Sequence, residues 1–435
     1  MTENKKLFIF LSTHLIVWTF IPSISNQNLP LDTIEALAWG SNLDWGFNKH
    51  PPMSAFAVEV IYQIFGKQDW AYYLLSQLFV VSSFYVIYIL ATELLSSKKH
   101  AFLSILLLET IFFYNFTTPE FNVNVCELPF WALCTYYTWK CINNNKIQNY
   151  FFLGVIAGLG ILSKYLFIYL IAGLGIFLII YFIKEKKIQF KFIISLTALA
   201  LTILPHVQWL FNNNFITITY GLNRAGNDSD LLNHILYPLI FLGKQFGILI
   251  LFFTMIFFLI QKFKVKINFN DKKLLFLFGA TIIPIILVTC TSVILGAKIR
   301  TMWMTPFYLF FGVLVMYIFQ NYIDFKKLKT FYILIGCIFF ISPSIYLYIS
   351  LANDNKRTDY PGKEIAKLIE NKIGNNSSLV SGDEWHAGNL SYHLKSRPKW
   401  VGYTKTFKNG VCFSEFPPKE FDLGKTQKSL VCLDK

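Results

Sequence analysis

Long apolar runs alternate with short polar segments over about the first 350 residues of the chain. A helix rises 1.5 Å per residue, so ~20 apolar residues are enough to cross a bilayer. The pattern therefore predicts an all-α polytopic membrane protein. We expect about 11 transmembrane helices, at residues 7–24, 69–95, 101–116, 126–142, 150–163, 166–183, 192–211, 235–260, 274–295, 302–320 and 330–350. The first has no clear small-residue cleavage site, so we expect it to be retained.

One apolar stretch, residues 151–183, is too long for a single span. A straight helix of that length would measure about 50 Å, well beyond the bilayer core. It would also place the lysines after residue 183 on the opposite side from the other lysine clusters. Two spans that meet near Lys164 satisfy both constraints, so we predict a break there.

Lysines recur in loops that all lie on one side of these spans. The clusters are at Lys5 and Lys6, Lys98 and Lys99, Lys140 and Lys146, Lys184 to Lys191, Lys262 to Lys273, and Lys326 to Lys329. Because positive loops stay cytoplasmic, we predict a multi-pass membrane protein with its N-terminus in the cytoplasm and its C-terminus outside the cytoplasm. The formal net charge of +14 is then a topology signal, and we expect no nucleic-acid partner.

Two domains follow from this topology. Residues 1–350 form the transmembrane domain, with a first outer loop at 25–68, and residues 351–435 form a small soluble α/β domain outside the cytoplasm. In the tail we expect helices at 363–373 and 385–394 and short strands at 378–381 and 400–403. Cys412 and Cys432 both lie in this tail, where an oxidising compartment favours their pairing. No Cys/His spacing is typical of a metal site, so no metal is predicted.

The first outer loop carries the strongest candidates for chemistry. Asp32 and Glu35 are one helical turn apart, so both carboxylates can share a face at the membrane edge, where a membrane enzyme would place a general base. The alternative is that they are first-turn acids after Pro30, complementing the helix dipole. Glu120 is another outer carboxylate, which we interpret as a plain turn acid.

Cations and aromatic side chains on the outer side could bind a lipid-linked phosphate and a sugar. Lys164 is the most informative, because an ionisable group at membrane depth is costly to bury without a function or a partner. Snorkelling lysines, loop charges and an interfacial aromatic belt are the alternatives. The candidates for substrate binding are Lys49, His50, Lys164, Arg224, Lys298, Arg300, Trp39 and Trp45. His206, after Pro205, we interpret as a packed histidine at a kink.

The first outer loop resembles that of the family-39-like glycosyltransferases, which include protein mannosyltransferase-like and aminoarabinose transferase-like bacterial enzymes. The resemblance covers about the first half of the chain. It rests on Asp32-x-x-Glu35, Trp39-Gly40, Trp45-Gly46, Lys49-His50-Pro51-Pro52, Phe65-Gly66, Phe121-Asn122, Leu128-Pro129-Phe130-Trp131 and Gly158 to Tyr165. The His-Pro-Pro turn is more similar to the branch that includes lipopolysaccharide-core uronic-acid transferases than to the acid-Lys-Pro turn of aminoarabinose transferases.

The resemblance implies a C-type glycosyltransferase (GT-C) fold in the bacterial inner (cytoplasmic) membrane, with the C-terminal domain in the periplasm. It also implies transfer of a single hexosyl or pentosyl unit, with inversion, from a polyprenyl-phosphate carrier to a lipid or glycan acceptor such as lipid A or the lipopolysaccharide core. Asp32 would be the catalytic base, with Glu35 supporting the cation at Lys49 or His50. Lys164 would hold the carrier phosphate, and Asn122 would contact substrate. No cofactor is required, although a divalent cation bridged by the two acids is a second arrangement.

Three other functions stay open from the residues. A flippase or transporter for a lipid-linked sugar also needs cations at membrane depth, and usually shows related halves. A glycan ligase or polymerase differs in transferring a chain instead of one sugar. In a non-catalytic interaction protein, Asp32 would be dispensable. Apart from membrane lipids, the partners we expect are the donor lipid and the acceptor.

Overall fold

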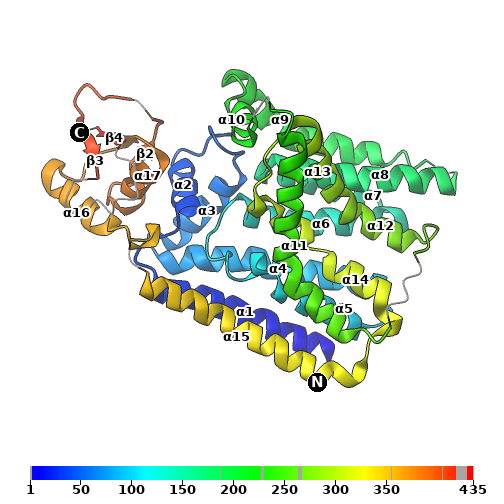
Figure 1. The fold of residues 1–435 in the computed structure, drawn as a ribbon. Coiled ribbons are helices and arrows are strands. Elements are labelled where there is room, and N and C mark those ends of the chain that lie inside the picture. The colour runs from blue at the N-terminus through cyan, green and yellow to red at the C-terminus, as the bar shows by residue number, and fades with distance from the viewer. Residues whose placement is uncertain are drawn as a thin grey trace.

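The structure, a computed structural model, describes residues 2–186, 188–226, 230–262, 267–353, 355–403, 405–417 and 429–434. The described part is a bundle of long helices with a small α/β unit at one end (Figure 1). The longer helices are α1 (Glu3–Ser25), α4 (Asp69–Leu94), α6 (Val123–Asn144), α7 (Ile147–Ser163), α8 (Ile168–Glu185), α9 (Phe192–Asn212), α11 (Asn233–Leu259), α13 (Ile282–Leu295) and α15 (Leu328–Ala352). Shorter ones are α2 (Leu31–Gly40), α3 (Met53–Phe65), α5 (Lys98–Leu106), α10 (Ile216–Ala225), α12 (Lys272–Ala280) and α14 (Phe311–Phe319).

The length and apolar character of the described helices are those of a multi-pass membrane protein. Seven of the helical segments are long and apolar enough to cross a bilayer. An eighth is counted if Thr301–Tyr308 and Phe311–Tyr322, bent by 50°, form one span. Their outer faces expose large apolar side chains such as Ile183, Phe246 and Phe340, as lipid contact requires.

The predicted spans differ from the described helices at four places, one of which is the bent pair of helices at the expected span 302–320. The expected helix over 101–116 is wrong, because α5 ends at Leu106 and continues as two short 3₁₀ turns to Tyr114. Helix α6 has the expected position, but it carries Glu127 and Lys140 and is not among the seven. Helix α7 is apolar but has only 17 residues. The total of about 11 spans therefore stays a prediction.

The predicted break at Lys164 is confirmed. Helix α7 ends at Ser163, Lys164 has an extended backbone, and a 3₁₀ turn at Tyr165–Phe167 leads into α8. The chain therefore reverses here instead of forming one long helix, and the lysine side chain is left at the turn.

The lysine-rich loops meet at one end of the bundle. The Nζ atom of Lys272 lies 2.8 Å from the side-chain oxygen of Asn143, and that of Lys273 lies 2.9 Å from the carbonyl oxygen of Glu93. Lys191 likewise contacts the carbonyl oxygen of Asn145. Their predicted position on a common side is thus supported, although Lys187 and residues 263–266 lie outside the described residues. In Figure 1 the N-terminus lies at the opposite end of the α1–α15 pair from the C-terminal unit.

The C-terminal domain is a small mixed α/β layer. Its elements are α16 (Gly362–Ile373), β1 (Leu379–Ser381), α17 (Glu384–His393), β2 (Lys399–Trp400), β3 (Val411–Phe416) and β4 (Ser429–Leu433). The sheet order is β2-β1-β4-β3, with β1 parallel to β2 and antiparallel to β4. Both predicted helices and both predicted strands are present within a few residues, whereas β3 and β4 were not predicted.

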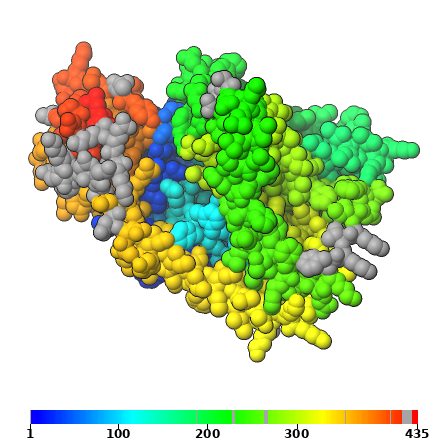
Figure 2. Space-filling view, viewed as in Figure 1, coloured from blue at the N-terminus to red at the C-terminus, as the bar shows by residue number. Residues whose placement is uncertain are grey.

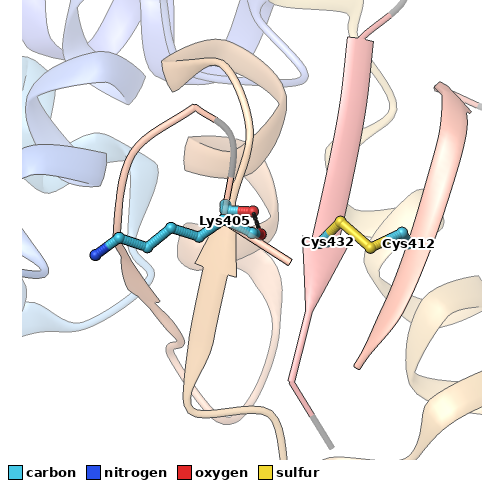
Figure 3. Close-up of a disulfide and its surroundings, with 4 residues drawn as sticks. Lys405, Cys412 and Cys432 are labelled. Carbon is cyan, nitrogen blue, oxygen red and sulfur yellow. Dashed lines mark hydrogen bonds between the residues drawn. A yellow bond between two sulfur atoms is a disulfide. The ribbon is translucent and has the colours of Figure 1, made fainter. Parts of the chain in front are cut away.

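A disulfide joins Cys412 to Cys432 across β3 and β4, at directly paired positions of the two strands (Figure 3). The predicted pairing is therefore confirmed. In the half of the sheet formed by β2 and β1, the Ser381 hydroxyl donates to the carbonyl oxygen of Lys405. This hydrogen bond ties the chain after β2 to the end of β1.

The C-terminal domain packs directly on the first outer loop. Helix α17 lies against α2 so closely that a Cβ atom at Gly388 would meet the carbonyl oxygen of Ile34 at 3.0 Å and the Cβ atom of Ala38 at 3.1 Å. Figure 2 shows this domain, in orange and red, beside the blue first loop. Helix α2 is therefore held between the tail of the chain and the membrane bundle.

Candidate functional site

Helix α2 presents its acidic face to a small cavity. Pro30, with an extended backbone, is the residue before the helix, so Asp32 and Glu35 occupy its first two turns. The cavity has an empty volume of about 220 Å³ and is lined by Asp32, Glu35, Trp39, His50, Ser54, Asn122 and Val123. Five of these residues are ones that the sequence analysis singled out, so the structure brings them together at one place.

Asp32 is a half-buried carboxylate next to a second acid. Its backbone N–H donates to Oε1 of Glu120 at 3.0 Å, so the turn that ends in Glu120 lies against the start of α2. Burial raises the pKa of Asp32 to about 7; Glu120 raises it further, while Lys49 and Arg224 oppose the rise. Burial also raises the pKa of Glu120. Nothing near Glu120 in the sequence connects it with Asp32, and the interpretation of Glu120 as a plain turn acid missed this contact.

Lys49 lies between two carboxylates. Its Nζ atom is 2.8 Å from Oε1 of Glu35 and 3.2 Å from Oε2 of Glu384, the first residue of α17. Burial lowers the pKa of Lys49, but the two acids outweigh that effect and the net shift is upward. Burial raises the pKa of Glu35 to about 7 in spite of Lys49. The expected support of Lys49 by Glu35 is therefore present in the geometry.

His50 is a neutral ring at the cavity wall. Burial, followed by the charges of Lys164 and Lys49, lowers its pKa to about 3, so it carries no charge at neutral pH. The ring meets Trp39 edge-on at 5.8 Å, and Trp39 stacks on Phe47 at 5.5 Å. Of the two alternatives for the outer-loop cation, Lys49 fits and His50 does not.

Lys164 is buried, with only 5% of its surface exposed. Its ammonium donates to the side-chain oxygen of Asn124 and lies 5.5 Å from the centre of the Trp303 ring. Burial lowers the pKa of Lys164 to about 8, against the opposing charges of Glu127 and Asp32. A buried ammonium with one neutral amide partner is a strong attractor for an anion.

The remaining predicted residues lie outside the cavity lining. Arg224 is exposed at the end of α10, where its guanidinium donates to the Tyr220 hydroxyl. Its positive charge lowers the pKa of both Asp32 and His50. Lys298 and Arg300 are exposed in a turn that adjoins α10, because the Lys298 N–H donates to the carbonyl oxygen of Ala225 at 2.8 Å.

Three further residues have contacts that account for their positions. Trp45 is 43% exposed, and its carbonyl oxygen is 2.6 Å from Nδ1 of His206. The other nitrogen of that ring is 2.7 Å from the Tyr165 hydroxyl, as expected for a packed histidine. Asn122 accepts from the N–H groups of Asn124 and Val125, so it caps α6 as well as lining the cavity.

Asn48 and two residues of the tail complete the site and were missed from the sequence. The Asn48 amide donates to Oε1 of Glu384 at 2.7 Å and to the Tyr403 hydroxyl at 3.2 Å. Tyr403 donates to the other oxygen of Glu384. Since more than 300 residues separate the partners, no local pattern could have indicated the contact.

Among the described residues, no group of three or more His, Cys, Asp or Glu side chains is arranged to hold a metal ion. The absence of a required cofactor stays a prediction.

Comparison with known proteins agrees with this architecture. Residues 49–209 match the family described as dolichyl-phosphate-mannose-protein mannosyltransferase. No curated protein sequence matches the chain significantly. Two solved structures of ArnT from Cupriavidus metallidurans share the fold. Each alignment covers 92% of this chain and 86% of the ArnT chain. The structure bound to undecaprenyl phosphate has a TM-score of 0.67 at 12% identity, and the apo state has 0.64 at 11%. The chain thus has a GT-C fold with a small C-terminal sheet domain and resembles the family-39-like membrane glycosyltransferases, as its first outer loop predicted.

Proposed function

We propose that the protein is an integral membrane glycosyltransferase that moves a single sugar from a polyprenyl-phosphate carrier to an acceptor hydroxyl outside the cytoplasm. The observation that carries this proposal is the cavity in which Asp32 and Glu35 face Trp39 and His50, with the charge of Lys164 acting on both Asp32 and His50. The fold shared with a protein bound to undecaprenyl phosphate supports a polyprenyl-linked donor.

In the proposed reaction, Asp32 accepts the proton of the acceptor hydroxyl. The hydroxyl oxygen attacks the anomeric carbon of the donor sugar, and the bond from that carbon to the phosphate oxygen breaks. The electron pair leaves with the polyprenyl phosphate, so a single displacement inverts the anomeric configuration. A raised pKa suits Asp32 to this role, because a general base works best when its pKa is near the working pH.

The leaving phosphate needs positive charge where its own negative charge develops. Lys164 can supply it from a buried position, where a charge is less screened by water than at the surface. Arg224 is the next cation, since its charge at the end of α10 lowers the pKa of both Asp32 and Lys164. Lys298 and Arg300 adjoin that helix and would contact the carrier further out.

The acceptor we propose is lipid A or the lipopolysaccharide core, with a hexosyl or pentosyl donor. This choice rests on the resemblance of the first outer loop, in which Trp39 lines the cavity. The location would be the bacterial inner membrane, with the lysine-rich end in the cytoplasm and the cavity and the C-terminal domain in the periplasm. The disulfide in that domain agrees with an oxidising compartment.

Mass spectrometry of cell-envelope glycolipids tests the proposal. Cells that lack the protein are compared with cells complemented by the wild type or by Asp32→Asn, with protein levels matched by immunoblot. We expect one sugar to be lost from one glycolipid in the deletion, restored by the wild type and not by Asp32→Asn. If Asp32→Asn restores it fully, Asp32 is not the base. An unchanged sugar pattern with donor lipid accumulating on the inner leaflet would instead indicate a flippase.

A further inference from the structure

Two polar side chains of the C-terminal domain, Glu384 and Tyr403, contact the Asn48–Lys49 turn of the first outer loop. Glu384 binds the Lys49 ammonium with one carboxylate oxygen, at 3.2 Å, and accepts from the Asn48 amide with the other, at 2.7 Å. Tyr403 donates to Glu384 and accepts from Asn48 at 3.2 Å. Every polar group of this small network comes from either the first outer loop or the tail of the chain.

The network is charged and largely buried. The exposed fractions of the side chains are 2% for Glu384, 18% for Lys49 and 12% for Glu35. Taking three charges out of water is costly, and an apolar contact would join the two domains at lower cost. What charged groups add is a defined geometry, since each oxygen of Glu384 has its own donor.

Helix α17 is held in place independently of Lys49. The Asp383 side chain caps the helix by accepting from the N–H groups of Trp385 and His386, and its second oxygen lies 2.7 Å from Nδ1 of His386. Further along, Gly388 allows the close approach to α2 described above. Glu384 therefore projects from a rigid element, which is what a residue needs in order to position another.

We infer that Glu384, assisted by Tyr403, is a positioning residue for the transfer reaction. It holds the Asn48–His50 turn and the Lys49 ammonium against Glu35, so that the C-terminal domain is a working part of the site and not a detached cap. The catalytic part of this inference rests on the proposed function. It also means that Lys49 is engaged with two carboxylates, which leaves the carrier phosphate to Lys164 and Arg224.

The positioning contact can be tested without any substrate. Hydrogen exchange of residues 44–50 is followed in the full-length protein in detergent, for the wild type and for Glu384→Gln. The Phe47 amide, which donates to the carbonyl oxygen of His50, is the most direct reporter. We expect its exchange to become about tenfold faster in Glu384→Gln. Unchanged exchange in this loop would overturn the inference.

A matched control separates this effect from a general loosening of the domains. Lys363 in α16 pairs with Asp69 in α4 at 3.2 Å, so it also joins the tail to the bundle, but Lys363 is exposed and the pair does not line the cavity. We expect Lys363→Gln to leave the exchange of residues 44–50 unchanged. If both variants loosen the loop equally, Glu384 has no specific role and the inference fails. Tyr403→Phe, which keeps the charge, provides a milder second variant with about a twofold effect.

Kinetics then test the consequence for the reaction. We expect Glu384→Gln to lower kcat about tenfold with KM within about twofold, and Glu384→Asp to recover part of the loss. Because Glu384 acts through Lys49, the effects should not be additive: in a Lys49→Met background, Glu384→Gln should add less than about twofold. Full additivity would contradict the assignment. If the wild type transfers no sugar in any glycolipid assay, the proposed function fails, whereas the exchange result still decides the contact.

Discussion

Each end of the bundle contains a lysine paired with carboxylates, but the carboxylates differ in how deeply they are buried. At the lysine-rich end, Lys140 pairs with Glu93, with exposed fractions of 19% and 33%, and other lysines contact backbone carbonyl oxygens. At the cavity end, Lys49 is shared by two carboxylates, one of them only 2% exposed. Exposed pairs contribute about 0–1 kcal/mol, whereas a charge that loses its partner in a buried cluster is costly. We expect the first end to set the orientation in the membrane, and we propose the second as the place of the chemistry.

Apart from Asp32, the largest expected effect is at Lys164, the most buried cation near the cavity. We predict that Lys164→Met lowers kcat by about 10²–10³-fold, the range seen when one donor to a developing negative charge is removed. Lys140→Met, at the other end, should leave kcat unchanged. The measurement is the rate of sugar transfer by the two purified variants at equal protein concentration. A Lys164→Met enzyme with near-wild-type kcat would remove the distinction between the two ends.

Close helix packing gives the next comparison. A Cβ atom added at Gly388 meets α2 at 3.0 Å, so Gly388→Ala should lower the free energy of unfolding by about 1–3 kcal/mol. At Gly175, in α8, no atom lies within 4 Å of an added Cβ, and Gly175→Ala should stabilise by about 0.5–1 kcal/mol through the helix backbone. Thermal unfolding in detergent should therefore move the two midpoints in opposite directions. Equal shifts would mean that α17 and α2 can separate at no cost.

Glu35→Gln should have a smaller effect on stability. The variant leaves Lys49 with Glu384 as its remaining carboxylate, so we expect the free energy of unfolding to fall by about 1–2 kcal/mol. Lys140→Met breaks the exposed pair with Glu93 and should change it by less than about 1 kcal/mol. Chemical unfolding monitored by tryptophan fluorescence compares the two, and a larger loss in Lys140→Met would reverse the contrast drawn here.

Local signals in the sequence predicted much of this arrangement. Pro30 marks the start of α2, the length of the apolar stretch indicates the break at Lys164, and Asp32 and Glu35 follow from helical spacing. Each of these depends on neighbours within one or two turns, which a single sequence records directly. The pairing of Cys412 with Cys432 followed from their shared compartment.

What could not be predicted depends on contacts between distant segments. Glu384 and Tyr403 reach the first loop only because the tail folds back on α2, and nothing near them in the sequence marks that. Glu120 joins Asp32 through a turn that looks ordinary. Lys298 and Arg300 are predicted to bind substrate because they lie on the outer side of the membrane. The side of the membrane does not determine how far a residue lies from the cavity, and neither residue lines it. Their role in binding stays a prediction.

The central claim is that Asp32 removes the proton of the acceptor, and the pH dependence of kcat tests it most directly. The carboxylate must be ionised to act, and its pKa is raised to about 7, so the wild-type rate should fall as pH drops below about 7. Glu35→Gln should keep this acidic limb, because Asp32 is still present. Asp32→Asn should be about 10²–10⁴-fold slower and should lack the limb. An Asp32→Asn enzyme that retains the limb, or that turns over at the wild-type rate, would contradict the account.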